Sequence, residues 1–208
     1  ECTAVAPPDP ELVRLLSERI SYVYPFPSRE IKTTVTGMVG EEEKSAAQKI
    51  PDDDAIMQKG TAYHAIMQKI DFTAPFEQER ERLKNMFTDE ISVPQIKAAH
   101  EYVSRLLCDF GGKVYREQSF VVDFDGTLVQ GIIDLMAING KRALILDYKL
   151  SGEKNLLSDK YVGQINAYAD AVEKVLKIKV EQLILYSFTS KTAKKVERRS
   201  SENKKSAF

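Results

Sequence analysis

The chain has 208 residues and a formal net charge of −1, which allows one domain with a real core and excludes a strong global field toward nucleic acid or membrane. Its two cysteines, Cys2 and Cys108, exclude a four-cysteine metal site and fit a reducing compartment. No apolar run is long enough to span a bilayer, so no membrane partner is expected. The chain begins with Glu1, and we expect it to be part of a longer polypeptide.

Residues 1–58 are expected to form an N-terminal helix and a lead-in. Apolar residues at helical spacing predict a helix within residues 8–24, ending before Pro25. Residues 31–39 read as a short strand at best. Residues 41–54 carry six acidic side chains and read as a solvated loop.

Three further helices are predicted before any long strand. Residues 60–70 place Tyr63, Ile66 and Met67 on one helical face, and residues 76–87 form a charged amphipathic segment. The third helix begins near Ser92 and ends at Gly111-Gly112. His100 and Cys108 lie in this helix, and we expect a structural histidine and a small buried cysteine.

The period then changes to that of strands. Residues 113–124, 127–138, 142–150 and 180–188 predict strands, and residues 158–177 predict a helix. The order β-β-β-α-β predicts an α/β fold, a central mixed sheet flanked by helices. We expect the core to cover residues 59–190. The basic residues 191–208 are expected to form a disordered tail, or one that follows a DNA backbone.

The two dipeptides Asp125-Gly126 and Asn139-Gly140 favour two-residue hairpin turns. With those turns, Phe124 faces Thr127, Ile138 faces Lys141, and Glu117 lies opposite Asp134. Asp147 is then one diagonal step from Asp134, and the alternation of strand side chains brings Lys149 to the same face. Phe120, Val122, Leu135, Leu144 and Leu146 should line the opposite, apolar face.

Three carboxylates beside one lysine repel one another, and each raises the pKa of the others. A divalent cation such as Mg²⁺ or Mn²⁺ would resolve the conflict, since both prefer oxygen ligands. A salt-bridged surface patch explains the same spacing equally well, so both interpretations stay open.

The stretch "DFDGTL" at residues 123–128 offers a different interpretation, the nucleophile loop of haloacid-dehalogenase phosphatases. Its context argues against that interpretation, because about 120 residues precede it and another strand follows. A calcium loop is also disfavoured, because the later ligands and flanking helices are absent. The segment is therefore expected to be a turn.

Five motifs in order resemble the PD-(D/E)xK nuclease superfamily, and more narrowly the RecB/AddA-type nuclease domain. They are "GTAYH" ending at His64, "REQSF" with Glu117, "GIID" with Asp134, "LDYK" with Asp147 and Lys149, and "QINAY" with Gln164 and Tyr168. The lead-in at residues 16–38 also resembles that of AddA helicase–nuclease subunits, so the resemblance covers nearly the whole chain.

The resemblance implies a role for each residue of these motifs. Asp134, Asp147, His64 and the backbone carbonyl of Tyr148 would hold Mg²⁺, with Mn²⁺ able to substitute. Lys149 would orient or deprotonate the attacking water and stabilise charge on the phosphoryl group. Glu117 would touch the metal through water or bind a second ion. The residues that would contact DNA or brace the lysine are Gln164 and Tyr168.

The implied activity is hydrolysis of DNA phosphodiesters, as the exonuclease part of a helicase–nuclease in double-strand-break repair and recombination. Its partners would be single-stranded DNA, a helicase region of the same polypeptide and a further polypeptide, the second helicase–nuclease subunit, in the bacterial cytoplasm. Relatives with four cysteines hold an iron–sulfur cluster, which this chain cannot form, and the chain has no phosphate loop. A catalytically inactive binding or scaffolding module and a stand-alone endonuclease are the alternatives.

Overall fold

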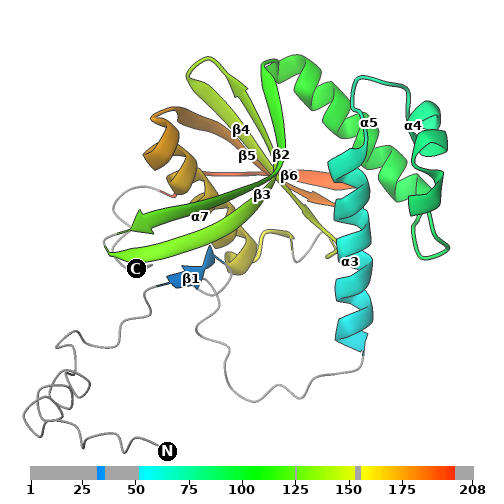
Figure 1. Cartoon of the computed structure of the whole chain (residues 1–208), viewed down its shortest axis with the longest axis horizontal. Helices are drawn as coiled ribbons and strands as arrows, with labels where there is room; N and C mark the ends of the chain where they lie inside the picture. The colour runs from blue at the N-terminus through cyan, green and yellow to red at the C-terminus, as the bar shows by residue number, and fades with distance from the viewer. Residues whose placement is uncertain (1–31, 36–51, 125, 153–155, 200–208) are drawn as a thin grey trace, which may run out of the picture. The chain divides into compact units, whose positions relative to one another are not determined.

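The computed structural model describes residues 32–35, 52–124, 126–152 and 156–199, with the backbone alone for residues 32 and 52–57. The helix predicted within residues 8–24 lies outside this part of the chain. The helices and strands (Figure 1) are β1 (Lys32–Thr34), α3 (Asp52–Lys69), α4 (Phe76–Arg82), the 3₁₀ turn η2 (Lys84–Met86), α5 (Val93–Phe110), β2 (Lys113–Phe124), β3 (Thr127–Asn139), β4 (Arg142–Lys149), α7 (Asp159–Leu176), β5 (Lys179–Ser187) and β6 (Thr192–Val196).

The six strands form one mixed sheet, as predicted. Its order is β1-β3-β4-β5-β6, and β2 pairs with the other edge of β3. Strand β3 runs antiparallel to both β2 and β4, whereas β4 and β5 are parallel and are joined through α7. This crossover helix is what a parallel pair requires, because a hairpin can connect only antiparallel strands.

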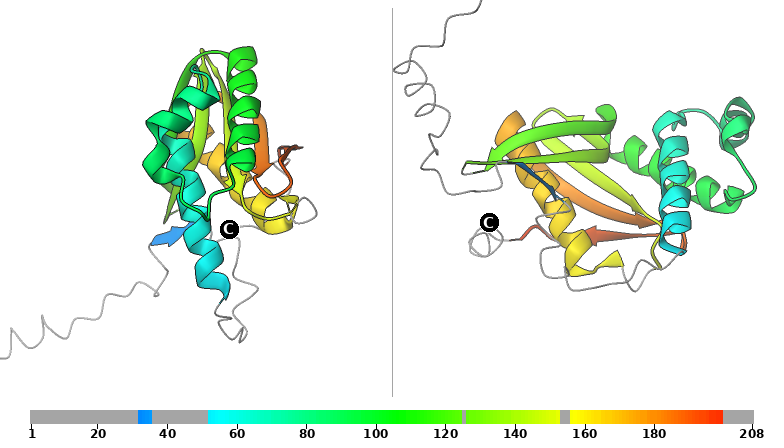
Figure 2. Two further views of the ribbon diagram at one scale, coloured as in Figure 1. Left: turned by 90° about the vertical axis from the view of Figure 1, so that its right-hand side faces the viewer. Right: turned by 60° about the horizontal axis from the view of Figure 1, so that its bottom comes forward.

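Helices cover both faces of the sheet, and each face has its own core (Figure 2). On one face, α3, α4 and α5 pack on the sheet, and we call this the α3–α5 core. On the other face α7 packs on the sheet, and we call this the α7 core. Strands β4 and β5 are buried from both sides, so that Leu144 and Leu146 point into the first core and Ala143 and Ile145 into the second.

The first hairpin has the predicted register. Phe124 pairs with Thr127, so the loop has two residues, and the pairs Arg116–Leu135 and Gln118–Ile133 bracket Glu117 opposite Asp134.

The predicted register of the second hairpin is wrong, because the two-residue loop begins one residue later than predicted. Asn139 pairs with Arg142, so the loop is Gly140-Lys141 and not Asn139-Gly140. The Asn139 side-chain amide donates to the Phe110 carbonyl at 2.8 Å, which fixes Asn139 in the strand. Gly140 then takes the first loop position with φ of 61°, as type II′ turns require. Because the pairing moves by two residues, the side-chain faces are kept and Asp147 comes level with Asp134.

The single apolar face predicted for these strands is also wrong. Leu135 belongs to the α3–α5 core, whereas Phe120 packs against the α7 core. Strand β2 changes face at Glu117, whose backbone takes a left-handed φ of 47°. This conformation is uncommon for a residue with a side chain, and it breaks the alternation without shifting the pairing.

Two predictions about the segments on either side of the expected core need correction. Helix α3 begins at Asp52, before the predicted core boundary at residue 59. The tail is not disordered throughout, because residues 192–196 form β6 and pair with β5. Arg198 then donates to Asp170 Oδ1 and Glu173 Oε2 of α7 at 2.8 and 2.7 Å, and these ion pairs hold the segment in place.

The two residues singled out on α5 differ in outcome. Cys108 is exposed, so the prediction of a buried cysteine is wrong. His100 is buried and structural, as predicted, since its ring stacks on Phe72 and its Nε2 lies 3.1 Å from the Asp71 carbonyl oxygen. No described helix is long and apolar enough to cross a membrane.

Candidate active site

The candidate site lies where β3 and β4 part. Their ladder runs from Asn139–Arg142 to Leu135–Leu146 and is not continued at the next residue. There the Asp134 carboxylate takes the place of a backbone carbonyl, and its Oδ2 accepts the Tyr148 N–H at 2.7 Å. Beyond this point β4 stays paired with β5 and β3 stays paired with β2, so the sheet forks.

His64 reaches the fork from α3. Its Nδ1 lies 3.3 Å from Asp134 Oδ1 and 4.0 Å from Glu117 Oε1. The imidazole packs edge-on against Tyr148, with ring centroids 5.9 Å apart, so its position is set by the core beneath it. One ligand atom from each of His64, Glu117 and Asp134 lies within 4.8 Å of the other two. The strand fork and the helix therefore bring together three potential metal ligands.

The charges of this cluster shift the pKa values of its members. Burial lowers the pKa of His64, but the hydrogen bond and the negative charge of Asp134 outweigh burial and raise it above its usual value. The pKa of Glu117 is raised by burial and by repulsion from Asp134. A cation at this point would relieve that repulsion, because it would favour the charged carboxylates.

A buried ion pair lies beside the cluster on β4. Asp147 is 2% exposed, and its Oδ2 lies 2.5 Å from Lys149 Nζ. Burial raises the pKa of Asp147 to about 6, although Lys149 acts in the opposite direction. Burial alone would lower the pKa of Lys149, but the charges of Asp147 and Asp134 raise it. Lys149 is therefore a cation at neutral pH.

Helix α7 covers this ion pair. Gln164 Nε2 donates to the Tyr168 hydroxyl at 2.8 Å, so the two motif residues are partners on one helix face. Burial and the charges of Asp147 and Asp134 raise the pKa of Tyr168. The aromatic ring that lies against Lys149 is that of Tyr161, 5.0 Å from Nζ to centroid. Tyr161 belongs to none of the five motifs, so the sequence did not indicate this contact.

The structure thus places the predicted residues at one fork, although in two groups. His64, Glu117 and Asp134 form the first group. Asp147 is not among these three and is paired with Lys149. The contact seen at Tyr148 is made by its N–H and not by the carbonyl expected as a ligand. Two carboxylates and one imidazole in reach of each other suit a divalent cation such as Mg²⁺ or Mn²⁺.

Comparison with known proteins shows the family to which the chain is similar. Residues 41–207 match the family model of the PD-(D/E)XK nuclease superfamily. The chain is 32% identical over 160 residues to an ATP-dependent helicase/nuclease subunit of Pelotomaculum thermopropionicum, covering 62% of this chain and 12% of that protein. It is 27% identical over 232 residues to the protein of the same name from Desulforamulus reducens, covering 88% of this chain and 19% of that protein. The chain spans less than a fifth of the length of either relative.

Proposed function

Because the chain belongs to the PD-(D/E)XK nuclease superfamily, we propose that it hydrolyses DNA phosphodiester bonds with a divalent cation, Mg²⁺ or Mn²⁺. The observation that carries this proposal is the cluster of His64, Glu117 and Asp134 beside the Asp147–Lys149 pair. Asp134, Asp147, His64 and the carbonyl of Tyr148 would hold the cation. Glu117 would bind this cation through water or would bind a second ion.

The chemistry divides between the cation and the protein. A bound divalent cation offsets negative charge on the phosphoryl oxygens and lowers the pKa of water. Lys149, cationic through its pairing with Asp147, orients the attacking water and stabilises the charge that develops on the phosphoryl group. Gln164 and Tyr168 would contact the DNA or brace Lys149. The fork keeps these groups at fixed positions, so little reorganisation accompanies the reaction.

The names of the relatives extend the proposal to a larger protein. Both are described as ATP-dependent helicase/nuclease subunits. We infer that this chain is the nuclease part of such a polypeptide, that it works with a second polypeptide of the helicase–nuclease, and that it cuts single strands delivered by the helicase during break repair. A catalytically inactive module of the same fold is disfavoured by the presence of Asp134, Asp147 and Lys149 together.

A cleavage assay tests the proposed activity. Wild-type protein should cut a labelled single strand with Mg²⁺ and not with EDTA, and Asp147→Ala and Lys149→Ala should each lose most of this activity. Asp109→Ala, an exposed carboxylate of α5, is the matched control and should cut like wild type. If both site variants cleave as fast as the control, the assignment of the site is wrong.

Metal binding provides an independent readout. Mn²⁺ should raise the melting temperature of wild-type protein, because a ligand that binds the folded state stabilises it. His64→Ala should abolish this shift, and Asp109→Ala should keep it. If Mn²⁺ raises the melting temperature of His64→Ala as much as that of wild type, His64 is not a ligand of the metal.

A further inference from the structure

The ammonium of Lys149 has two neighbours of different chemistry at the fork. Its Nζ lies 2.5 Å from Asp147 Oδ2 on β4 and 5.0 Å from the centroid of the Tyr161 ring on α7. The side chain of Lys149 is 15% exposed and that of Asp147 is 3% exposed, so water screens these contacts little. The face of an aromatic ring attracts a cation, and it does so more strongly where water is excluded. Tyr161 therefore helps to set the place of the ammonium.

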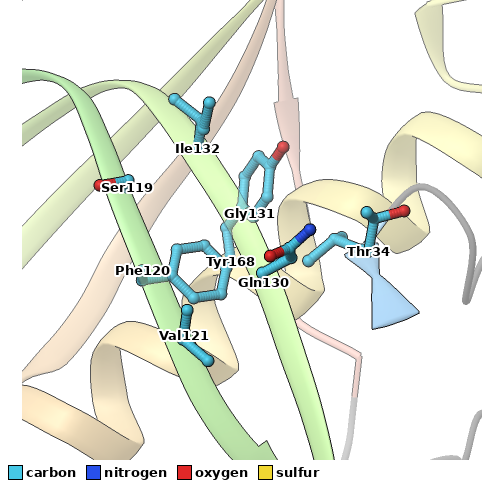
Figure 3. Close-up of a pocket in the computed structure, with 9 residues that line it drawn as sticks. Thr34, Ser119, Phe120, Val121, Gln130, Gly131, Ile132 and Tyr168 are labelled. Atoms are coloured by element: carbon cyan, nitrogen blue, oxygen red, sulfur yellow. The ribbon is translucent and has the colours of Figure 1, made fainter. Parts of the chain in front are cut away.

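The packing of α7 fixes the Tyr161 ring independently of the lysine. Tyr161 lies in the first turn of α7 and packs against the α7 core. Ile165 and Tyr168, one and two turns further along the same helix face, are 0% and 4% exposed. The Tyr168 ring meets Phe120 of β2 edge to face, with centroids 5.8 Å apart, and this contact ties the helix to the sheet (Figure 3). The ring of Tyr161 is thus held at a set position beside β4.

A second contact for the ammonium matters because Asp147 serves two cations in the proposed site. Under the proposed function Asp147 is also a ligand of the divalent cation, and its charge is then shared between that cation and Lys149. The two cations repel each other, so Asp147 holds Lys149 less firmly when the site is loaded. An additional carboxylate would restore the hold, but it would repel the phosphate of the substrate. An aromatic ring attracts the ammonium and brings no formal charge.

We propose that Tyr161 is a positioning residue, whose ring keeps the Lys149 ammonium at the fork while Asp147 holds the cation. This inference rests on the proposed function, because it concerns the lysine that the proposed function places beside the phosphoryl group. A lysine side chain is flexible and adopts many conformations unless it is held. The ring limits these conformations before the substrate arrives. Loss of the ring should therefore lower kcat and change KM little.

NMR measures the contact in metal-free protein, because nuclei above the face of an aromatic ring resonate upfield. In protein labelled with ¹³C at the lysine ε-carbons, the Lys149 signal is identified by its loss in Lys149→Arg. In EDTA its ε-protons should resonate upfield of those of exposed lysines in wild type and in Tyr161→Phe, and should return toward them in Tyr161→Leu. Tyr115→Leu is the matched control, because the Tyr115 ring centroid lies 5.1 Å from Lys113 Nζ on β2. This variant should shift the Lys113 signal and leave that of Lys149 in place.

Cleavage kinetics test what the contact does. With Mg²⁺ and a labelled single strand, Tyr161→Leu should lower kcat by roughly tenfold. Its KM should stay within about twofold of wild type, because substrate binding is not affected. Tyr161→Phe keeps the ring and should cut at the wild-type rate, as should Tyr115→Leu. Because Tyr161 acts through Lys149, Tyr161→Leu should cause no further loss in the Lys149→Ala background.

Three results would overturn the proposal. A wild-type Lys149 signal at the position of exposed lysines would mean that the ring does not hold the ammonium, and this readout stands even if Tyr161→Leu does not fold. A folded Tyr161→Leu protein with wild-type kcat, or with an equal further loss in the Lys149→Ala background, would mean that the ring serves only the packing of α7. If wild type shows the shifted signal but cuts no DNA with Mg²⁺ or Mn²⁺, the proposed function fails, and the role of Tyr161 fails with it.

Discussion

The ion pair of Asp147 and Lys149 predicts that two substitutions at the candidate site have opposite effects on stability. Asp147 is 2% exposed and its pKa is raised from 3.8 to about 6. This shift in pKa corresponds to a free energy of about 3 kcal/mol. At neutral pH the charged carboxylate destabilises the metal-free fold by this amount. Asp147→Asn removes this charge and should stabilise the metal-free protein by up to about 3 kcal/mol. Lys149→Met removes the compensating cation and should destabilise it by about 3 kcal/mol.

The pH dependence follows from the direction of the shift. An acid whose pKa is raised by folding stabilises the folded state while it is protonated, and this contribution is lost as the pH rises through the folded-state value. Wild-type stability should therefore fall between about pH 4 and pH 6 on account of Asp147, and Asp147→Asn should not show this decrease.

Urea unfolding in EDTA, followed by circular dichroism, measures both differences. Asp109→Asn, on the exposed side of α5, is the control for the loss of one negative charge and should match wild type. A lower unfolding free energy for Asp147→Asn than for wild type at neutral pH would refute the reasoning. So would a Lys149→Met protein as stable as wild type. Either result would mean that the pair is better solvated than its burial indicates.

Two further predictions concern the surroundings of the site. Glu79 is 3% exposed and accepts a hydrogen bond from the Asp71 N–H at 2.7 Å, so Glu79→Gln should cost about 2 kcal/mol in urea unfolding, whereas the exposed Glu81→Gln should cost little. Hydrogen bonding lowers the pKa of Glu79, so its contribution should persist at neutral pH and disappear as the pH falls through that lowered value. Gly131→Ala should destabilise the fold by about 1–3 kcal/mol and so lower the melting temperature, because its Cβ would meet the Phe120 ring at 2.7 Å. Gly152→Ala, whose Cβ would lie in open space, should not lower the melting temperature.

The sequence was sufficient for the parts of the fold that depend on local chemistry. The change of period after Gly112 and the dipeptide Asp125-Gly126 predicted the strands and the first hairpin, and with them the pairing of Glu117 with Asp134. The second hairpin depends on a contact that the sequence does not reveal. Asn139 is held in β3 by the Phe110 carbonyl, 29 residues away, so its preference for a turn is overruled.

The geometry of the site was less predictable than its residues. Glu117 has a positive φ, which no local pattern indicates for a glutamate, and this bend moves the neighbouring apolar side chains to the other face. The contact of Tyr161 with Lys149 joins α7 to β4, two elements that the sequence does not place against each other. Such tertiary features follow from packing, and spacing along the chain does not record them.

Asp134 connects the fold to the proposed chemistry. Where β4 leaves β3, the N–H of Tyr148 loses its partner in the ladder, and a buried N–H without a partner costs about 1–3 kcal/mol. Asp134 Oδ2 accepts this N–H, while Oδ1 lies toward His64. A neutral side chain could satisfy the N–H, but only a carboxylate also brings a negative charge to the histidine and to a cation. The residue that satisfies the backbone at the fork is therefore also the one that would bring charge to the proposed cation, which explains why the sheet can open here at little cost.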